Sequence, residues 1–365
     1  MARNRVIYQS EALFMSETAA SVLATKHAQL ERVQSANFSY TINRQDINQF
    51  GELARIDSVI LDPPTVSADF SYYLTDGYNE RALGFYVKTG AITPRNFASG
   101  QMTPGSGQNA FIATSPEGID INTDGALSAT DSVIGIGNCY LTDYSVDMSV
   151  GSIPTASVSM EGANVRSDIE ADSIDSPAVL QEEGTSVEKV IALPTPVSGV
   201  SAIAALRPGD ITVSISNFTG DTIADISGDG ASHVQSVSLS APFSRTPLDR
   251  LGSRFPFARE VDFPLTVSMS ISAIVNETVA FQLADKLNAG AKAAQVTLKD
   301  KDGIPALRWM LSGAKVDSES FSSSIGSNQS VDITLSAQVG GINDGSNGLF
   351  LSGANQTAAY GIIQG

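Results

Sequence analysis

One strand pattern occurs twice in this chain, and this internal repeat limits what the chain can fold into. Val33–Leu74 aligns without a gap on Val234–Val275, 201 positions later. Identical residues include Val33-Gln34-Ser35 on Val234-Gln235-Ser236, Arg44 on Arg245, Gly51 on Gly252, Pro63 on Pro264 and Thr65-Val66-Ser67 on Thr266-Val267-Ser268. Apolar residues alternate in the same phase in both copies, which predicts two strands with one buried face around an irregular connection. We interpret the pattern as a duplication of one β unit.

The end of the unit is repeated as well. Gly151-Ser152 precedes an alternating run that starts at Ala156, and Gly326-Ser327 precedes one that starts at Val331, 175 positions later. The smaller offset means that the second copy is shorter in its middle. These boundaries predict a first β domain over residues 1–165, an acidic linker or excursion over 166–205, a second β domain over 206–340 and a C-terminal loop or arm over 341–365.

Local patterns predict further elements. The expected strands are 6–8, 12–15, 133–140 and 144–150, with a hairpin formed by 296–298 and 308–311. Short helices are expected over 17–31, 80–87 and 277–293, and an exposed loop over 95–108.

The composition excludes several functions. The formal net charge of −17 argues against a surface that grips nucleic-acid phosphates, because such binding needs clustered Lys and Arg. The single Cys139 rules out a disulfide within the chain and is expected to be a buried structural residue. We expect no secretory signal and no membrane-spanning helix, because no run of about 18 apolar residues occurs.

The sequence offers little for catalysis or metal binding. His27 and His233 lie in different halves, and structural or surface roles are expected for both. The run Asp120-Ile121-Asn122-Thr123-Asp124-Gly125, with Asp131 further on, follows calcium-loop spacing, but its flanks read as turn and strand. A hairpin tip rich in Asp and Gly explains the same residues. We therefore predict no enzyme activity, no catalytic or metal-binding residues and no cofactor, and leave calcium binding by this loop open.

Several segments together resemble bacteriophage tail tube proteins and related virion tail proteins. They are 4–10 (NRVIYQS), 31–38 (ERVQSANF), 51–57 (GELARID) with 63–67 (PPTVS), and 150–159 (VGSIPTASVS). The resemblance implies a mainly β fold of two tandem copies of a small antiparallel β-barrel or sandwich, each with a short helix. Such units join sheet to sheet in a ring around a channel, and the rings stack into a tube for genome delivery.

The usual ring of six single-domain subunits and the duplication in this chain together suggest three chains per ring with pseudo-sixfold symmetry; six chains remain the alternative. The expected partners are other copies of the chain, a tape-measure protein and double-stranded DNA held loosely in the lumen. A sheath, baseplate or terminator proteins are further possible partners, and no membrane is expected. The protein would be made in the host cytoplasm and reside in the virion.

The physics of strand edges agrees with this interpretation. Exposed strand edges invite pairing, and ring closure removes them. The polar phase of the repeated strands is expected to line the lumen, where a neutral-to-acidic wall lets DNA slide. These residues are Asn37, Ser39, Thr41, Ser67, Asp69, Ser71, Ser238, Ser240, Ser268, Ser270 and Ser272.

The connections 43–57 and 244–258 are expected either to reach a neighbouring subunit or ring, or to be ordinary solvent-exposed hairpins. Their charged residues are Arg44, Asp46, Glu52, Arg55, Arg245, Asp249, Arg250 and Arg254. Two other functions compete with a tube subunit. One is a distal tail or baseplate-hub ring protein, and the other is a monomeric two-domain binding module, which would need exposed aromatic platforms.

Overall fold

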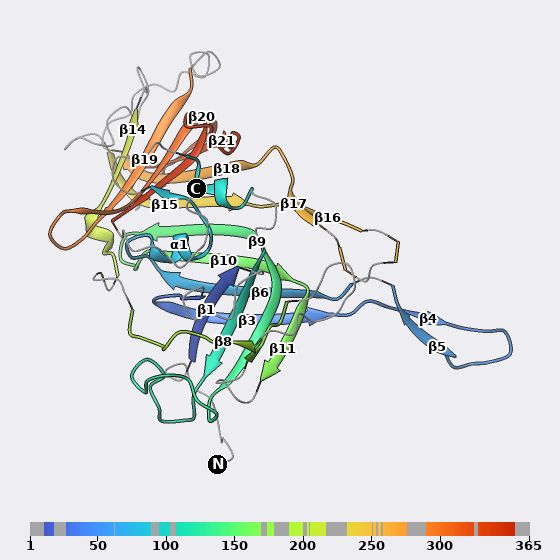
Figure 1. The fold of residues 1–365 in the computed structure, drawn as a ribbon. Coiled ribbons are helices and arrows are strands. Elements are labelled where there is room, and N and C mark those ends of the chain that lie inside the picture. The colour runs from blue at the N-terminus through green and yellow to red at the C-terminus, as the bar shows by residue number, and fades with distance from the viewer. Residues whose placement is uncertain are drawn as a thin grey trace.

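The computed structural model shows a mainly antiparallel β protein with one short α-helix in its described part (Figure 1). It describes residues 11–17, 27–61, 63–88, 95–102, 107–168, 174–178, 190–199, 203, 205–216, 232–249, 251–252, 255–256, 258–275, 290–324 and 328–354. The mainly β prediction is confirmed.

The strands of the first half are β1 (Glu11–Glu17), β2 (His27–Gln29), β3 (Val33–Thr41), β4 (Arg44–Ile47), β5 (Asp57–Ile60), β6 (Thr65–Tyr73), β7 (Val87–Lys88), β8 (Gln108–Thr114), β9 (Ser132–Ser149), β10 (Thr155–Gly162) and β11 (Asn164–Asp168). Those that follow are β12 (Ile174–Asp175), β13 (Val190–Ile191), β14 (Ile211–Ser216), β15 (Ser232–Pro242), β16 (Arg245–Leu248), β17 (Ala258–Val261), β18 (Thr266–Val275), β19 (Lys292–Lys299), β20 (Pro305–Ser322), β21 (Ser330–Gln338) and β22 (Gly348–Gly353). The helices are α1 (Tyr78–Ala82) and the 3-10 turns η3 (Phe97–Gly100) and η4 (Pro208–Asp210).

The two copies of the sequence repeat also pair their strands in the same register. β4, β5 and β6 begin 201 positions before β16, β17 and β18. β3 pairs with β6 as β15 pairs with β18, so that Ser39 faces Ser67 and Ser240 faces Ser268. Even the β-bulge after Val33 recurs after Val234. The predicted pair of strands around a connection is therefore present in both copies.

The repeat extends through β9–β10 and β20–β21. The bulge in β9 leaves Met160 facing Leu141, and 175 positions later the bulge in β20 leaves Leu335 facing Val316. β9 and β20 both change partners along their length, pairing first with β8 or β19 and then with β10 or β21. In the described residues, each copy thus includes a run of six paired strands in the same order: β1-β8-β9-β10-β6-β3 and β14-β19-β20-β21-β18-β15.

The main core draws on both copies, because alternating apolar residues of all these strands point to the same side. The segment after α1 lies across the junction of the copies. Its Phe85 and Phe97 contact Tyr144 of β9 and Phe243, which follows β15, with ring centroids 4.8–6.3 Å apart. These ring contacts tie the two halves into one packed unit.

Several expected boundaries were wrong. Residues 27–29, expected at the end of a helix, form β2, and Lys292 and Ala293 begin β19. The strands expected at 133–140 and 144–150 are one long strand, β9. The loop expected to be exposed at 95–108 contains η3, whose four residues are buried against the core.

The expected linker and C-terminal arm also contain structure. β11 runs into the linker, and Ile174, Ala178 and Ile191 are buried within it. β22 lies in the expected arm but pairs with β20, and its first four residues are buried. The expected strand at 6–8 and the rest of the expected helices at 18–26 and 277–289 lie outside the described residues.

Candidate assembly interface

The two copies are joined edge to edge inside the chain. β15 pairs with β18 on one side and with β9 on the other, so that Ser236 faces Ser149 and Ser240 faces Ser145. β9 and β15 lie side by side in Figure 1, and one continuous sheet runs through both copies. We call this pairing the internal joint.

The internal joint is closed by small and large apolar side chains that face each other. Leu239 faces Val146, and Ala241 faces Tyr144. All four side chains are buried. Such cross-strand pairs are the unit of sheet stabilisation, and here they seal one copy against the other.

The hairpin β16–β17 clamps the internal joint from one end. Nε of Arg245 donates to the backbone carbonyl of Leu141 at 3.3 Å, and its guanidinium lies 5.2 Å from the ring of Tyr140. Burial lowers the pKa of Arg245 to about 10, which leaves it charged at neutral pH. Arg259 of the same hairpin pairs with Glu161 of β10 at 2.6 Å. The second copy thus holds the first through charged groups as well as through strands.

The outer ends of the continuous sheet are β3 and the second half of β20. β3 pairs with β6, and residues 315–322 of β20 pair with β21. In the described part of the chain, no further strand pairs with either of them on the opposite side. β3 is the counterpart of β15 in the sequence repeat, and this half of β20 is the counterpart of the second half of β9. The two outer edges therefore correspond to the two strands that form the internal joint.

Burial differs between the joint and the outer edges. Phe38 and Tyr40 of β3 are 37% and 61% exposed, whereas their counterparts Leu239 and Ala241 are 2% and 0% exposed. Phe321 of β20 is 43% exposed, and its counterpart Val146 is fully buried. Large apolar side chains on the exposed edge of β3 are typical of an interaction surface.

The opposite face of the continuous sheet is polar. All eleven residues predicted to line a lumen lie on this face. Each of them is paired with a polar residue on a neighbouring strand. One row crosses eight strands and consists of Ser35, Ser71, Ser157, Ser145, Ser240, Ser268, Ser336 and Lys315. Hydroxyl pairs bridge adjacent strands, such as Ser39–Ser67 at 2.8 Å and Ser270–Thr334 at 3.2 Å.

The charges on this polar face are mostly acidic. Asp69, Asp143, Asp147 and Asp332 extend its rows, and Lys315 is a cation at its margin. Partial burial raises the pKa of Asp143. A face of hydroxyls and carboxylates offers little to hold phosphate groups.

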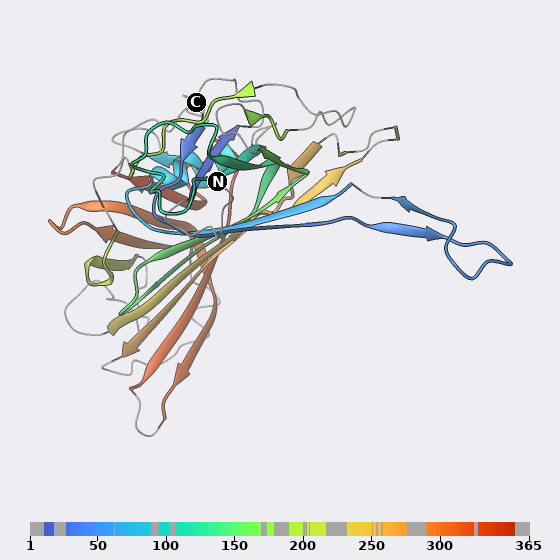
Figure 2. The same ribbon diagram turned by 90° about the horizontal axis from the view of Figure 1, so that it is seen from below.

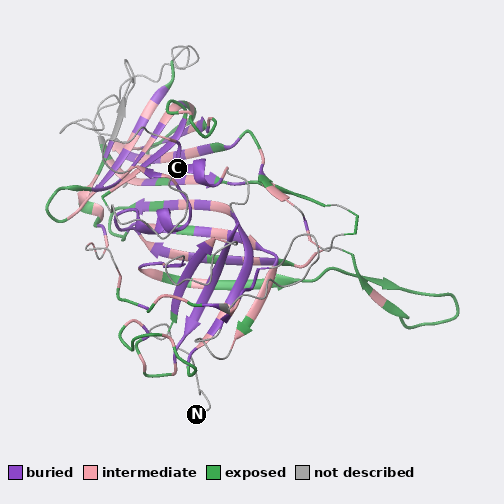
Figure 3. Cartoon of the chain, viewed as in Figure 1, coloured by how far each residue is buried: buried purple, intermediate pink, exposed green. Residues whose placement is uncertain are grey.

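The β4–β5 hairpin projects far from the rest of the chain, as Figure 2 shows. Its residues are exposed except for the half-buried Ser58 (Figure 3), and Phe50 and Leu53 at its tip are fully exposed. Leu251, the counterpart of Phe50, is equally exposed at the tip of the second connection. Each is followed by a glycine with positive φ, Gly51 or Gly252, so the two tips share one turn.

The charged residues predicted in these connections differ in their surroundings. Arg44, Glu52 and Asp249 are exposed, and Asp46 pairs with Arg55 across the first hairpin at 2.9 Å. Arg245 instead belongs to the clamp on the internal joint. Arg250 and Arg254 lie outside the described residues.

Other polar and titratable residues of the described part lie in turns and in the core. Within the described part, no group of three or more His, Cys, Asp or Glu side chains could hold a metal ion. Asp120 accepts from the backbone N–H of Asn122, and Asp131 accepts from that of Ser128, so both cap turns of their loop. His27 is buried with its ring 5.7 Å from that of Phe111, and burial raises the pKa of Cys139 to about 12.

One buried acid was missed by the sequence reasoning. Glu80 of α1 accepts hydrogen bonds from Tyr72 and Tyr144 at 3.0 and 3.3 Å through one carboxylate oxygen. Burial raises its pKa from 4.5 to about 7. It lies beneath the sheet and away from the polar face, so we assign it to the core.

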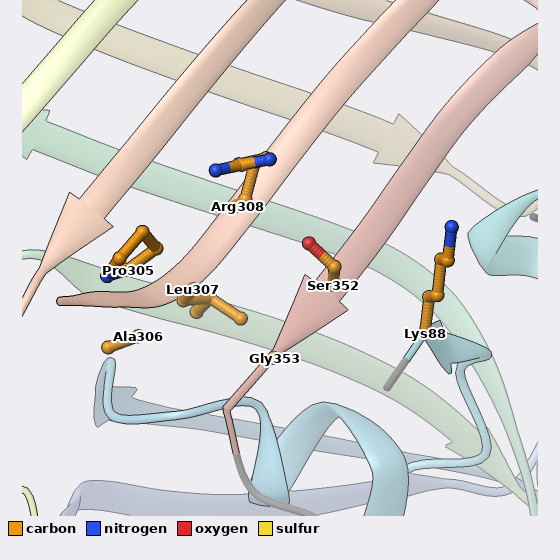
Figure 4. Close-up of a pocket in the computed structure, with 7 residues that line it drawn as sticks. All are labelled: Lys88, Pro305, Ala306, Leu307, Arg308, Ser352 and Gly353. Atoms are coloured by element: carbon orange, nitrogen blue, oxygen red, sulfur yellow. The ribbon is translucent and has the colours of Figure 1, made fainter. Parts of the chain in front are cut away.

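A shallow cavity of about 280 Å³ lies where β7 joins β22. Lys88 and Arg308 approach it from different strands with Ser352 between them (Figure 4). The residues that line it include no carboxylate or histidine that could serve as a general base. Lys88 and Arg308 are thus the charged groups of its lining.

Comparisons with known proteins give little support for any assignment. No family model and no curated protein matches the chain. One similar solved structure is a chain of the anti-feeding prophage (AFP) baseplate, determined by cryo-EM with 6-fold symmetry, at 12% identity and a TM-score of 0.24. The match covers 34% of this chain and 85% of that chain. At this TM-score the likeness assigns neither fold nor function. No helix among the described residues is long and apolar enough to cross a membrane.

Proposed function

We propose that the protein is a structural subunit of a phage-type tail tube, with three chains in each ring. The observation that carries this proposal is the internal joint. The chain contains one complete edge-to-edge joint between its copies and, at its two outer ends, the counterparts of the two strands that form it. Pairing the exposed β3 edge of one chain with another copy in the same way would repeat the joint between chains.

Such pairing is head to tail, because the two outer edges differ. A heterologous contact builds a closed ring when its rotation closes, and otherwise an open filament. If each joint between chains repeats the rotation at the internal joint, and if that rotation is one sixth of a full turn, six copies from three chains complete a ring with pseudo-sixfold symmetry. Closure also removes the exposed edges, which would otherwise invite uncontrolled pairing.

The polar face supports a channel. In a ring, the apolar side of each sheet is already covered by its own core, which leaves the polar face to meet the enclosed water. Its serines and aspartates repel phosphate or bind it weakly, and this suits DNA that must pass without sticking. A tape-measure protein, a sheath, a baseplate and terminator proteins remain expected partners of such a tube.

The hairpin tips support stacking. Phe50 and Leu251 occupy equivalent tips and are fully exposed, although Leu251 belongs to the hairpin that already clamps the internal joint. The Leu251 tip is thus exposed even though its hairpin takes part in a joint. We expect the Phe50 tip to stay exposed in the same way in a joint between chains. Val150 and Ile153 are exposed in the turn at the other end of the sheet, where a second ring could receive the tips.

Electron microscopy of the purified full chain tests the proposal. We expect long hollow tubes of uniform width. Single rings would favour the baseplate-hub alternative, and particles of one chain at all concentrations would contradict both assembly functions.

A further inference from the structure

We propose that the β4–β5 hairpin of one chain docks into a cavity between β20 and β21 of the next chain, where the carboxylates of Asp317 and Asp344 hold Arg44. The inference rests on the proposed ring and adds the contact that clamps each joint between chains. Its occupant is a second copy of this chain.

The cavity has a volume of about 520 Å³ and is lined by β20, by the end of β21 and by the loop that follows β21. Lys315 and Asp317 of its lining are exposed. Asp344 of the loop accepts hydrogen bonds from the backbone N–H groups of Ser346 and Asn347. Hydrogen bonds from these two residues lower the pKa of Asp344, so it is charged at neutral pH. Two carboxylates and one cation therefore line the cavity, which favours a positive group.

The cavity is the counterpart of the surface on which the β16–β17 hairpin lies. Shifted by 175 positions, Tyr140 and Glu161 of the first copy fall on Lys315 and Ser336 of the cavity lining. In the first copy, the guanidinium of Arg245 lies over the Tyr140 ring, and the other arginine of the same hairpin pairs with Glu161. In the described part of the chain, the counterpart of this docking surface on the second copy is left as the cavity.

The β4–β5 hairpin lacks the contacts that bury its own counterpart. Val261 of β17 is 8% exposed, whereas Ile60, 201 positions earlier, is 50% exposed. Phe243, just before β16, is fully buried, whereas its counterpart Ile42 is 39% exposed. Arg44 is exposed, and no ion pair with another described residue involves it. An apolar face beside an unpaired cation is thus available on this hairpin.

One ion pair of the clamp on the internal joint is replaced on both sides. Arg259 of the β16–β17 hairpin pairs with Glu161, and their counterparts are Ser58 and Ser336. If one of these two positions had kept its charge, docking would leave that charge without its partner, and burying an unpaired charge is costly. The paired exchange of arginine and glutamate for two serines therefore agrees with contact between the β4–β5 hairpin and the cavity.

The other arginine of the clamp is retained, and the cavity supplies carboxylates for it. Arg44 is identical to its counterpart Arg245. The aromatic ring beneath Arg245 is replaced in the cavity by Lys315, whose charge is outnumbered by those of Asp317 and Asp344. Hydrogen bonds from a guanidinium to carboxylates are stronger than hydrogen bonds between neutral groups. Arg44 therefore gains ionic partners in place of the ring.

The hairpin that fits the cavity belongs to another chain. β3, which leads into the β4–β5 hairpin, is seven strand spacings away from β20 in the continuous sheet. At about 4.8 Å for each spacing, the two strands are roughly 34 Å apart along the sheet. The hairpin also points away from β20 and β21 in Figure 1. The β16–β17 hairpin of the same chain is already docked at the internal joint.

Charge reversal in the full chain tests the docking. R44E should raise the critical concentration for assembly about tenfold or more, because it places a third carboxylate beside Asp317 and Asp344. D317K should raise it as well, whereas R44E/D317K restores opposite charges and should return it to within about threefold of wild type. K301E is the matched control, since Lys301 is exposed in the β19–β20 turn and the substitution changes the net charge as R44E does.

Thiol labelling tests whether the docking face of the hairpin becomes covered. The cysteine of I60C should react with a maleimide at least about fivefold more slowly in tubes than in single chains, because the counterpart of Ile60 is buried in its joint. I304C is the matched control, because Ile304 is 60% exposed in the β19–β20 turn and should stay accessible. Cys139 is buried and does not compete.

A critical concentration for R44E within about twofold of that for K301E, or no recovery in R44E/D317K, would overturn the docking while wild-type tubes leave the proposed function standing. Equal labelling of I60C in tubes and in single chains would also overturn it. Absence of any assembly from the wild-type chain would overturn the proposed function itself. Circular dichroism of each variant verifies that single chains are folded.

Discussion

Replacing Tyr40 by serine should weaken assembly far more than it weakens the folded chain. Tyr40 is 61% exposed, and its counterpart in the internal joint is fully buried. An aromatic side chain buries on the order of 200 Å², so closing the joint removes roughly 120 Å² of Tyr40 from water. At about 25 cal/mol per Å², this burial contributes about 3 kcal/mol to each joint.

The free energy that Tyr40 contributes to each joint determines how far its loss raises the critical concentration for assembly. Each chain added to a tube forms one joint between chains, and about 1.4 kcal/mol corresponds to a factor of ten. The Y40S variant should therefore need a concentration about 100-fold higher than wild type before tubes sediment. I304S is a matched control, because Ile304 is 60% exposed but lies in the β19–β20 turn, away from both outer edges.

Sedimentation over a concentration series measures the effect, and urea unfolding of the unassembled variants measures the stability of the chain. Both substitutions should lower that stability by similar amounts, since the two side chains are buried to the same extent in one chain. A critical concentration for Y40S within about twofold of that for I304S would refute the assignment of β3 to a joint.

Three further predictions concern stacking, stability and the polar face. The F50S/L251S variant should form rings that do not stack, because it removes the exposed apolar residue that the two tips have at equivalent positions; long tubes in electron micrographs would contradict this. E80Q should flatten the pH dependence of stability. The pKa of Glu80 rises from 4.5 to about 7 on folding, so its contribution is present below pH 4.5 and lost as pH rises through 7, by about 3 kcal/mol at pH 8. Urea midpoints at pH 5 and pH 8 test it, and an equally steep dependence in E80Q would assign the effect elsewhere. S268K/S270K tubes should retain DNA at low salt and release it as salt rises, whereas wild-type tubes should not bind it; equal binding by both would argue against a lumenal position.

The repeat was predictable because it is carried by local alternation. Period 2 fixes which residues of a strand share a face, so the polar residues from Asn37 to Ser272 could be assigned to one face without coordinates. The structure adds that both copies pair their strands in one register, including the bulges after Val33 and Val234.

What the sequence did not reveal depends on contacts between distant segments. β22 consists of Gly348–Gly353 in a Gly-rich tail and is a strand because β20 offers it an edge. η3 is buried because Phe97 packs against Phe243, 146 residues away. The internal joint was missed for the same reason, because its two strands, β15 and β9, are distant in the sequence.

The central claim is that three chains close a ring through alternating joints. A cryo-EM cross-section of the wild-type tube tests it most directly. We expect six similar β units per ring that alternate in two forms, so that threefold symmetry improves the map and sixfold symmetry blurs the β4–β5 and β16–β17 hairpins. A ring of six whole chains, or a tube in which β3 takes no part in the contact between chains, would contradict it.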